Sequence, residues 1–257
     1  MKSSKVDSCI ESSSFILHTP NLDEAAKQQL GKGENVLYAI DIDGTIARPE
    51  AVLIAFHNQE FALGLTSEEL RCTYSHFLQL PQVAELRREA LQDSRQRART
   101  TPETVLAYDE VEHAAATLNL LAKQGEIMYY TVRPACVQDV TYTWLQKKHF
   151  PHPHNIILCH SVLNKLVQLF VHERETHHRI VLIDDRYQQM IEDFARLAHG
   201  EFSHISDWQE VVHFAQQRVL LVAFGATCMS ADTTGLQVVP MQSWKHIAAV
   251  HQLSFIV

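Results

Sequence analysis

A short apolar run that ends in two carboxylates constrains this chain more than any other stretch. Residues 36–47 read VLYAIDIDGTIA, and the first five are apolar on both faces, as in a strand buried inside a parallel sheet. Asp41 and Asp43 follow, and Gly44 indicates a sharp turn. Open α/β sheets place their chemistry at the carboxyl ends of strands. Taken alone, the stretch predicts either an ordinary Asp-Gly turn or a site that contains two acids.

Composition and charge narrow the class of protein. The chain has 257 residues, 46% of them apolar and 20% charged, with no long apolar segment, which favours a globular protein over a disordered or membrane-spanning one. A formal charge of −8 argues against a nucleic-acid polymer as the main partner. The 5 cysteines form no CxxC pair, and the amino terminus lacks an apolar signal core. We therefore expect a cytoplasmic protein, and the oligomeric state stays open.

The spacing of apolar residues divides the chain into three parts. Residues 1–35 are polar at first and are expected to form an extension with one short helix over 22–30. Residues 49–107 have helical spacing throughout and predict a small all-helical unit. Residues 36–48 and 108–257 are expected to form an α/β core.

The last helix of the 49–107 segment is strongly basic. Such a run usually forms a solvated face, and the alternative is that one or two of the arginines reach into the site and hold an anionic substrate. The run contains Arg87, Arg88, Arg95, Arg97 and Arg99.

From residue 108 onward, helical and strand patterns alternate. The expected helices are 109–124, 134–148, 161–173, 187–198, 208–216 and a closing helix from Ser243, and the expected strands are 127–130, 156–159, 179–183, 219–224 and 238–239. This alternation predicts a parallel sheet covered by helices on both faces.

Polar groups follow several of these strands. Thr131 ends one strand, Lys165 comes shortly after another, and Asp184 with Asp185 ends a third. Each has an ordinary explanation taken singly: a helix cap, a surface lysine, a turn. Their joint placement with Asp41 at one end of a parallel sheet favours a functional site.

Together, these residues resemble the motifs of the haloacid dehalogenase superfamily in its phosphatase branch. AIDIDGT matches the first motif, MYYTVRP the second, Lys165 the third and VLIDDR the fourth, in the family's order. The resemblance implies a Rossmann-like three-layer parallel sheet. It also implies a small helical cap of the C1 type after the first strand, because the chain between the first two motifs is much longer than a strand, helix and strand require.

The resemblance also implies roles for individual residues. Asp41 would attack phosphorus and form an aspartyl-phosphate, and Asp43 would protonate the leaving oxygen and then activate water. Gly44, Thr131 and Lys165 would bind the phosphoryl oxygens. Dehalogenases of this superfamily lack the second acid, so its presence favours phosphoryl transfer to water.

A magnesium ion is expected in the same site, since clustered carboxylates provide the oxygen ligands that Mg²⁺ prefers. By the resemblance, Asp41, the backbone carbonyl of Asp43 and Asp185 would bind it directly, and Asp184 would act through water. Arg133, two residues after the second-motif threonine, is a candidate substrate contact.

The sequence therefore predicts a Mg²⁺-dependent phosphatase for a small phosphorylated metabolite. Two alternatives stay open: a phosphomutase that uses the same two aspartates, and a non-catalytic protein that binds a phosphometabolite. A response-regulator receiver is set aside, because its acidic pair comes first in the chain and here the pair VLIDD comes last. The substrate itself is not predicted.

Overall fold

A computed structural model describes residues 35–202, 205–228 and 235–251 of the chain. The predicted amino-terminal extension lies outside these ranges, apart from Asn35, and so does its helix over 22–30. Within the described ranges, no helix combines the length and the apolar character that crossing a membrane requires.

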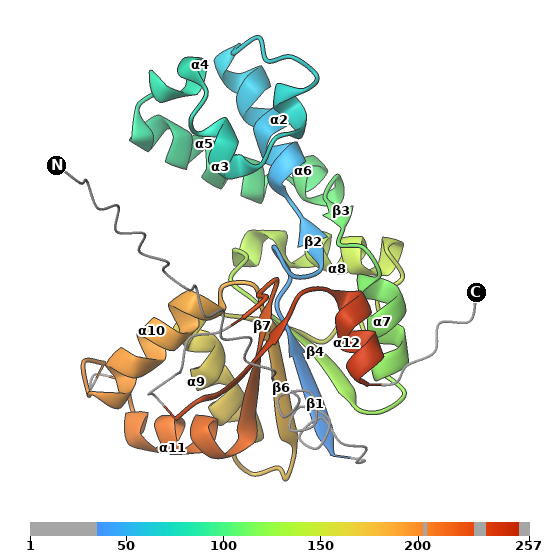
Figure 1. Cartoon of the computed structure of the whole chain (residues 1–257), viewed down its shortest axis with the longest axis vertical. Coiled ribbons are helices and arrows are strands. Elements are labelled where there is room, and N and C mark those ends of the chain that lie inside the picture. The colour runs from blue at the N-terminus through green and yellow to red at the C-terminus, as the bar shows by residue number, and fades with distance from the viewer. Residues whose placement is uncertain (1–34, 203–204, 229–234, 252–257) are drawn as a thin grey trace, which may run out of the picture.

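Six parallel strands form the central sheet (Figure 1), in the order β5-β4-β1-β6-β7-β8. Their bounds are β1 Val36–Ile40, β4 Glu126–Thr131, β5 Ile156–Leu158, β6 Arg179–Asp184, β7 Val219–Phe224 and β8 Gln237–Met241. The first apolar run is β1, and all of its residues are buried between β4 and β6. The predicted parallel α/β fold is confirmed.

Helices cover both faces of the sheet. One face carries α7 Ala114–Leu121, α8 Gln138–Lys147 and α12 Trp244–Val250, and the other carries α9 Val162–Glu173, α10 Tyr187–Ala198 and α11 Trp208–Arg218. Alternate residues of β1 serve the two layers, since Tyr38 packs with the first set and Leu37 and Ala39 with the second. The sheet is therefore buried on both sides.

The helix predicted over 109–124 is wrong at both ends. Asp109–Glu110 forms strand β3, which pairs antiparallel with β2, Ala47–Arg48. The amide of Val111 then donates to the carbonyl of Ile46 at 2.9 Å, and α7 begins only at Ala114. The chain leaves and re-enters the core through this small ribbon. Its pairing is with residues far away in sequence, which a local apolar pattern cannot show.

We call α2 to α6 the helical insert. It consists of α2 Glu50–Phe61, η1 Glu69–Arg71, α3 Tyr74–Phe77, α4 Pro81–Ala84, α5 Arg88–Thr100 and α6 Pro102–Leu106. The insert lies beyond β2, at the end of the sheet where β1 finishes (Figure 1). It has an apolar cluster of its own, in which Ile54 of α2 packs with Phe77 and Val83.

A buried histidine after the closing helix makes the stability of the protein depend on pH. His251 follows α12 and is buried with its ring against Tyr38, and this burial lowers its pKa from 6.5 to about 4. The unfolded chain binds a proton on this histidine more tightly than the folded protein does. The free energy of unfolding therefore has its full value above a pH of about 6.5, and it falls as the pH drops toward 4. The expected loss is about 3 kcal/mol at most.

Urea unfolding of the protein at several pH values between 7 and 4 measures this effect, with His251→Phe as the comparison. The free energy of unfolding of His251→Phe should fall less with decreasing pH than that of the unsubstituted protein. Parallel curves for the two proteins would show that His251 does not contribute.

Candidate active site

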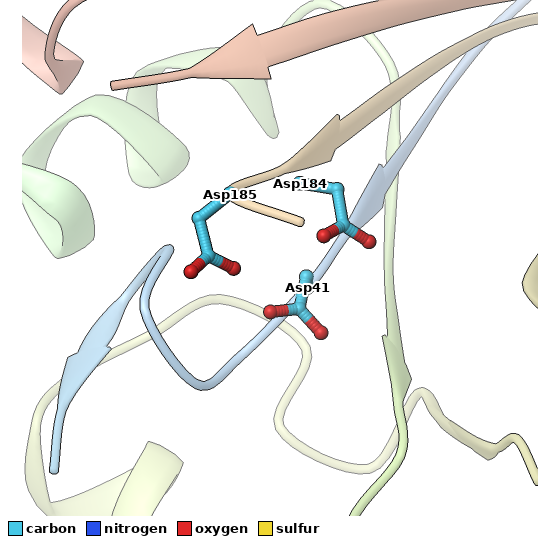
Figure 2. Close-up of side chains that lie close together, drawn as sticks. All are labelled: Asp41, Asp184 and Asp185. Atoms are coloured by element: carbon cyan, nitrogen blue, oxygen red, sulfur yellow. The ribbon is translucent and has the colours of Figure 1, made fainter. Parts of the chain in front are cut away.

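Three carboxylates meet at the carboxyl end of the sheet. Asp41 directly follows β1, Asp184 is the last residue of β6, and Asp185 comes next. Because β1 and β6 are neighbours, their ends lie side by side. One oxygen from each carboxylate lies within 4.8 Å of the others, and Figure 2 shows the three groups facing a common space.

A buried lysine joins two of these acids. Lys165 lies in the first turn of α9, a helix capped by Ser161, whose hydroxyl accepts from the amide of Asn164. The Lys165 ammonium donates to Asp41 Oδ1 at 2.5 Å and to Asp184 Oδ2 at 2.6 Å. Burial alone would lower the pKa of Lys165, but the two carboxylates raise it above its ordinary value. The lysine therefore stays charged.

The cluster still carries excess negative charge. Burial raises the pKa of Asp41, and the charges of Asp184 and Asp185 add to the rise while Lys165 opposes it. Burial and the neighbouring Asp184 likewise raise the pKa of Asp185 to about 6. A cation placed among the three carboxylates would relieve this repulsion. The oxygen-only donor set fits a hard divalent ion, so the cluster can hold a metal.

The second aspartate of the loop has a different environment. Asp43 is bound by Arg133, whose Nη2 donates to Oδ1 at 2.6 Å and whose Nε lies 3.2 Å from each oxygen. The guanidinium also donates to the hydroxyl of Thr141 at 3.1 Å, and it lies over the rings of Tyr108 and Trp144 at 5.3 and 5.7 Å. A buried, caged cation thus fixes the Asp43 carboxylate.

A second arginine reaches the same carboxylate from the helical insert. Arg99 Nη2 lies 3.3 Å from Asp43 Oδ2. Burial would raise the pKa of Asp43, but Arg133 first and Arg99 second hold it below its ordinary value. Arg133, which the sequence offered as a candidate substrate contact, here holds an acid of the site. One sequence signal pointed to Arg133, its position two residues after Thr131, and it did not indicate the contact with Asp43.

The turn after Asp43 is fixed by backbone and side-chain bonds. The Gly44 amide donates to the carbonyl of Ala47 at 2.8 Å, so this N–H, expected near phosphate, is used within the turn. The Thr45 hydroxyl accepts from the amide of Asp185 at 3.1 Å and lies 3.4 Å from Asp41 Oδ2. Trp244 Nε1 donates to the Thr45 carbonyl at 2.8 Å. The closing helix therefore supports the turn, a link that no motif in the sequence indicated.

Gly44 cannot be replaced by a larger residue without disturbing the cluster. Its φ of +95° favours glycine, and a Cβ atom there would lie 2.1 Å from Asp185 Oδ2. We expect Gly44→Ala to destabilise the protein by about 1–3 kcal/mol and to displace the Asp185 carboxylate. Thermal unfolding measures the first effect, and the shift in thermal unfolding on adding a divalent cation measures the second. Unchanged stability and an unchanged shift would contradict the expectation.

A polar cavity of about 570 Å³ opens over these groups. Its core side includes Asp41, Asp43, Gly44, Thr131 and Asp185. Its other side is formed by residues of α2 and α5 from the helical insert. Cavities of this size hold small molecules. The site residues predicted from the four motifs thus lie together, with Lys165 and Asp184 buried directly beneath.

Of the five arginines in the basic run, Arg95 and Arg99 line this cavity. The other three, which are Arg87, Arg88 and Arg97, do not line it. Thr131, the last residue of β4, is buried, and its hydroxyl accepts from the amide of Arg133 at 3.3 Å.

Comparison with known proteins gives one relative by sequence. The chain is 23% identical over 194 residues to "Putative nucleotidase YqfW" of Bacillus subtilis (strain 168), across 68% of this chain and 91% of that protein. No protein-family model matches the chain.

Solved structures that resemble the fold are described as haloacid dehalogenase-type hydrolases. One is a subfamily IA, variant 1 hydrolase of Geobacter sulfurreducens PCA, at 15% identity and a TM-score of 0.48 over 84% of this chain and 96% of that one. Another, from Deinococcus radiodurans R1 with bound phosphate and sodium, has 12% identity and a TM-score of 0.49 over 86% and 97%.

Proposed function

We propose that this chain is a haloacid dehalogenase-type phosphatase that hydrolyses a small phosphomonoester. One observation carries the proposal: the first-strand aspartate, the acidic pair and the buried lysine converge beneath a polar cavity, with a second aspartate beside them. The name of the Bacillus subtilis relative, a nucleotidase, supports a phosphomonoester as the substrate class.

Two aspartates divide the chemistry. An oxygen of Asp41 attacks phosphorus, the bond from phosphorus to the leaving oxygen breaks, and Asp43 supplies the proton to that oxygen. In the second step Asp43 takes a proton from water, which attacks the aspartyl-phosphate and releases Asp41. Arg133 lowers the pKa of Asp43 and so favours its carboxylate form, which suits this second step. The first step needs the protonated form, which the Arg133 pair opposes.

The remaining residues offset charge. The Lys165 ammonium, already 2.5 Å from Asp41, would stabilise the phosphoryl oxygens as they approach. Thr131 lines the cavity and would donate its hydroxyl proton to a phosphoryl oxygen. Magnesium, held by Asp41, Asp185 and the Asp43 carbonyl with Asp184 acting through water, would supply the positive charge that brings a phosphate dianion to a carboxylate.

The helical insert would act as a cap on the α/β core. The proposal divides the chain into a core of residues 36–48 and 108–257 and a cap of residues 49–107. Residues from both parts line the cavity. Helices α2 and α5 form one wall, and residues at the ends of the strands form the other. A cap in this position would exclude water during the first step and contact the leaving group.

Release of phosphate from p-nitrophenyl phosphate by the full-length protein tests the proposed function. We expect turnover with Mg²⁺ and its loss after treatment with EDTA, restored when Mg²⁺ is added back. No turnover of this compound or of a broad phosphoester panel in Mg²⁺ would contradict the proposal and would favour a protein that only binds a phosphometabolite.

A further inference from the structure

Four polar residues of α5 form a single stripe that faces the active-site cavity. Gln92, Arg95, Gln96 and Arg99 are spaced i, i+3, i+4 and i+7, which places them on one side of a helix. All four line the cavity. We call them the α5 stripe. Helix α5 thus turns two guanidinium groups and two amides toward the catalytic aspartates.

The opposite side of α5 is anchored, so the stripe has a fixed direction. Ser94 is buried, and its hydroxyl lies 2.7 Å from Nδ1 of His57 in α2. Ser94 also donates to Glu60, which accepts from Arg97. His57 in turn stacks on Phe77 of the insert's apolar cluster. Rotating α5 away from the cavity would break this network.

The positive charge of Arg99 exceeds what Asp43 requires. Arg133 already gives Asp43 a bond of 2.6 Å and two of 3.2 Å from a buried position, whereas Arg99 offers one contact at 3.3 Å. A partly exposed contact of this length is weak beside a caged, multidentate one. Arg99 can therefore serve a second anion without leaving Asp43 unpaired.

Arg95 lies in a similar position without an acidic partner. Its guanidinium lies over the ring of Tyr74 at 5.2 Å, and no carboxylate of the described residues is within ion-pair distance of it. The insert contributes one acid to the cavity wall, Glu50, against these two arginines. Leu53 of the insert and Val132 of the core add apolar surface to the cavity. The cavity therefore suits a carbon chain that ends in an anion.

We propose that the α5 stripe binds a second anionic group on the leaving part of the substrate. The preferred substrate would be a phosphomonoester whose alcohol also carries a carboxylate or a second phosphate. The scissile phosphoryl group would lie at Asp41 and the second anion at Arg95 and Arg99, with hydrogen bonds from the two glutamines. This inference rests on the proposed phosphatase function and names its substrate class.

Three probes that each contain four carbons in a row test the proposal: n-butyl phosphate, 4-(phosphonooxy)butanoate and 1,4-butanediol bisphosphate. We expect kcat/KM for at least one of the two probes with a second anion to exceed that for n-butyl phosphate by at least about tenfold. The better of the two distinguishes a carboxylate from a phosphate. Equal kcat/KM for all three probes would overturn the inference while leaving the phosphatase function in place.

Variants locate the preference. The quantity compared is the kcat/KM of the better two-anion probe divided by the kcat/KM of n-butyl phosphate. In the double variant Arg95→Gln/Arg99→Gln this ratio should fall to about one, and the double Arg→Lys variant should restore part of it. Arg88→Gln is the matched control, because Arg88 begins the same helix, carries the same charge, is exposed and does not line the cavity. Its ratio should equal that of the unsubstituted protein. A preference that persists in the double Gln variant would overturn the assignment to the stripe.

A nucleoside monophosphate provides the last comparison, because its leaving nucleoside has no second anion. Adenosine 5′-monophosphate hydrolysed at least ten times faster than both two-anion probes would overturn the inference and favour recognition of a neutral leaving group by the same wall. If instead the unsubstituted protein hydrolyses neither the probes nor p-nitrophenyl phosphate, it is the phosphatase function that fails.

Discussion

Asp41→Asn will reduce phosphate release from p-nitrophenyl phosphate by at least about 1,000-fold. An amide oxygen cannot serve as the attacking nucleophile, and the remaining groups of the site cannot replace it. The fold should survive, since the new amide still accepts from Lys165, and Lys165 keeps its 2.6 Å bond to Asp184. Single-turnover assays of the purified variant, with circular dichroism as the check on folding, measure the result.

Two further variants make this test specific. Asp41→Ala removes the side-chain oxygens entirely and should be as inactive as Asp41→Asn. Asp139→Asn makes the same chemical change at an exposed position in α8 and should leave turnover unchanged. If Asp41→Asn and Asp41→Ala keep turnover within tenfold of the unsubstituted protein, another group is the nucleophile.

Lys165→Met will cost both activity and stability. It removes the one cation buried between Asp41 and Asp184 and leaves two close carboxylates uncompensated. Breaking a buried ion pair from one side costs about 3–5 kcal/mol. We expect a loss of stability in this range and a fall of at least about 100-fold in kcat/KM. Magnesium should recover part of the stability, because it would offset the same negative charge.

Denaturant unfolding with and without Mg²⁺, together with phosphate-release kinetics, measures these effects. Lys147→Met is the matched control, since Lys147 is exposed at the end of α8, and an exposed lysine contributes little. A Lys165→Met protein as stable and as active as Lys147→Met would show that the buried ammonium is dispensable.

Local apolar patterns predicted the correct bounds where one buried strand or one amphipathic helix decides the structure. The run at Val36–Ile40 is a strand with the predicted bounds, and the helix over 187–198 begins and ends as expected. The apolar pattern of each segment specifies its structure, because only a strand in the first case and only a helix in the second buries all of the apolar side chains.

Elsewhere a correct local signal did not give the expected element. Thr66 and Glu69 form a capping box, a pattern that commonly begins a helix, with bonds of 2.7 and 3.2 Å, yet only the single 3₁₀ turn η1 follows. The amphipathic pattern over 109–124 likewise contains a strand and a turn before its helix, since His113 has a φ of +65°. Packing in the insert and pairing with β2 override propensity in these segments.

For the site, strand position was the useful signal. A parallel sheet brings the ends of neighbouring strands together, so the joint placement of Asp41, Thr131, Asp184 and Asp185 followed from their position after strands. Lys165 also comes shortly after a strand, and the resemblance to known motifs assigned it a role. Its bonds to two carboxylates could not be derived from spacing, because they depend on how α9 packs against the sheet.

The sequence by itself therefore determined the alternation of helices and strands in the core, the parallel sheet and the acids at the carboxyl ends of its strands. These follow from local periodicity and from residues adjacent to strands. Only the tertiary structure decided that Arg133 and Arg99 hold Asp43, that Trp244 supports the turn, and that the α5 stripe faces the aspartates. Such contacts join residues up to 199 positions apart. Only the packing of the folded chain brings them together, and no local pattern records it.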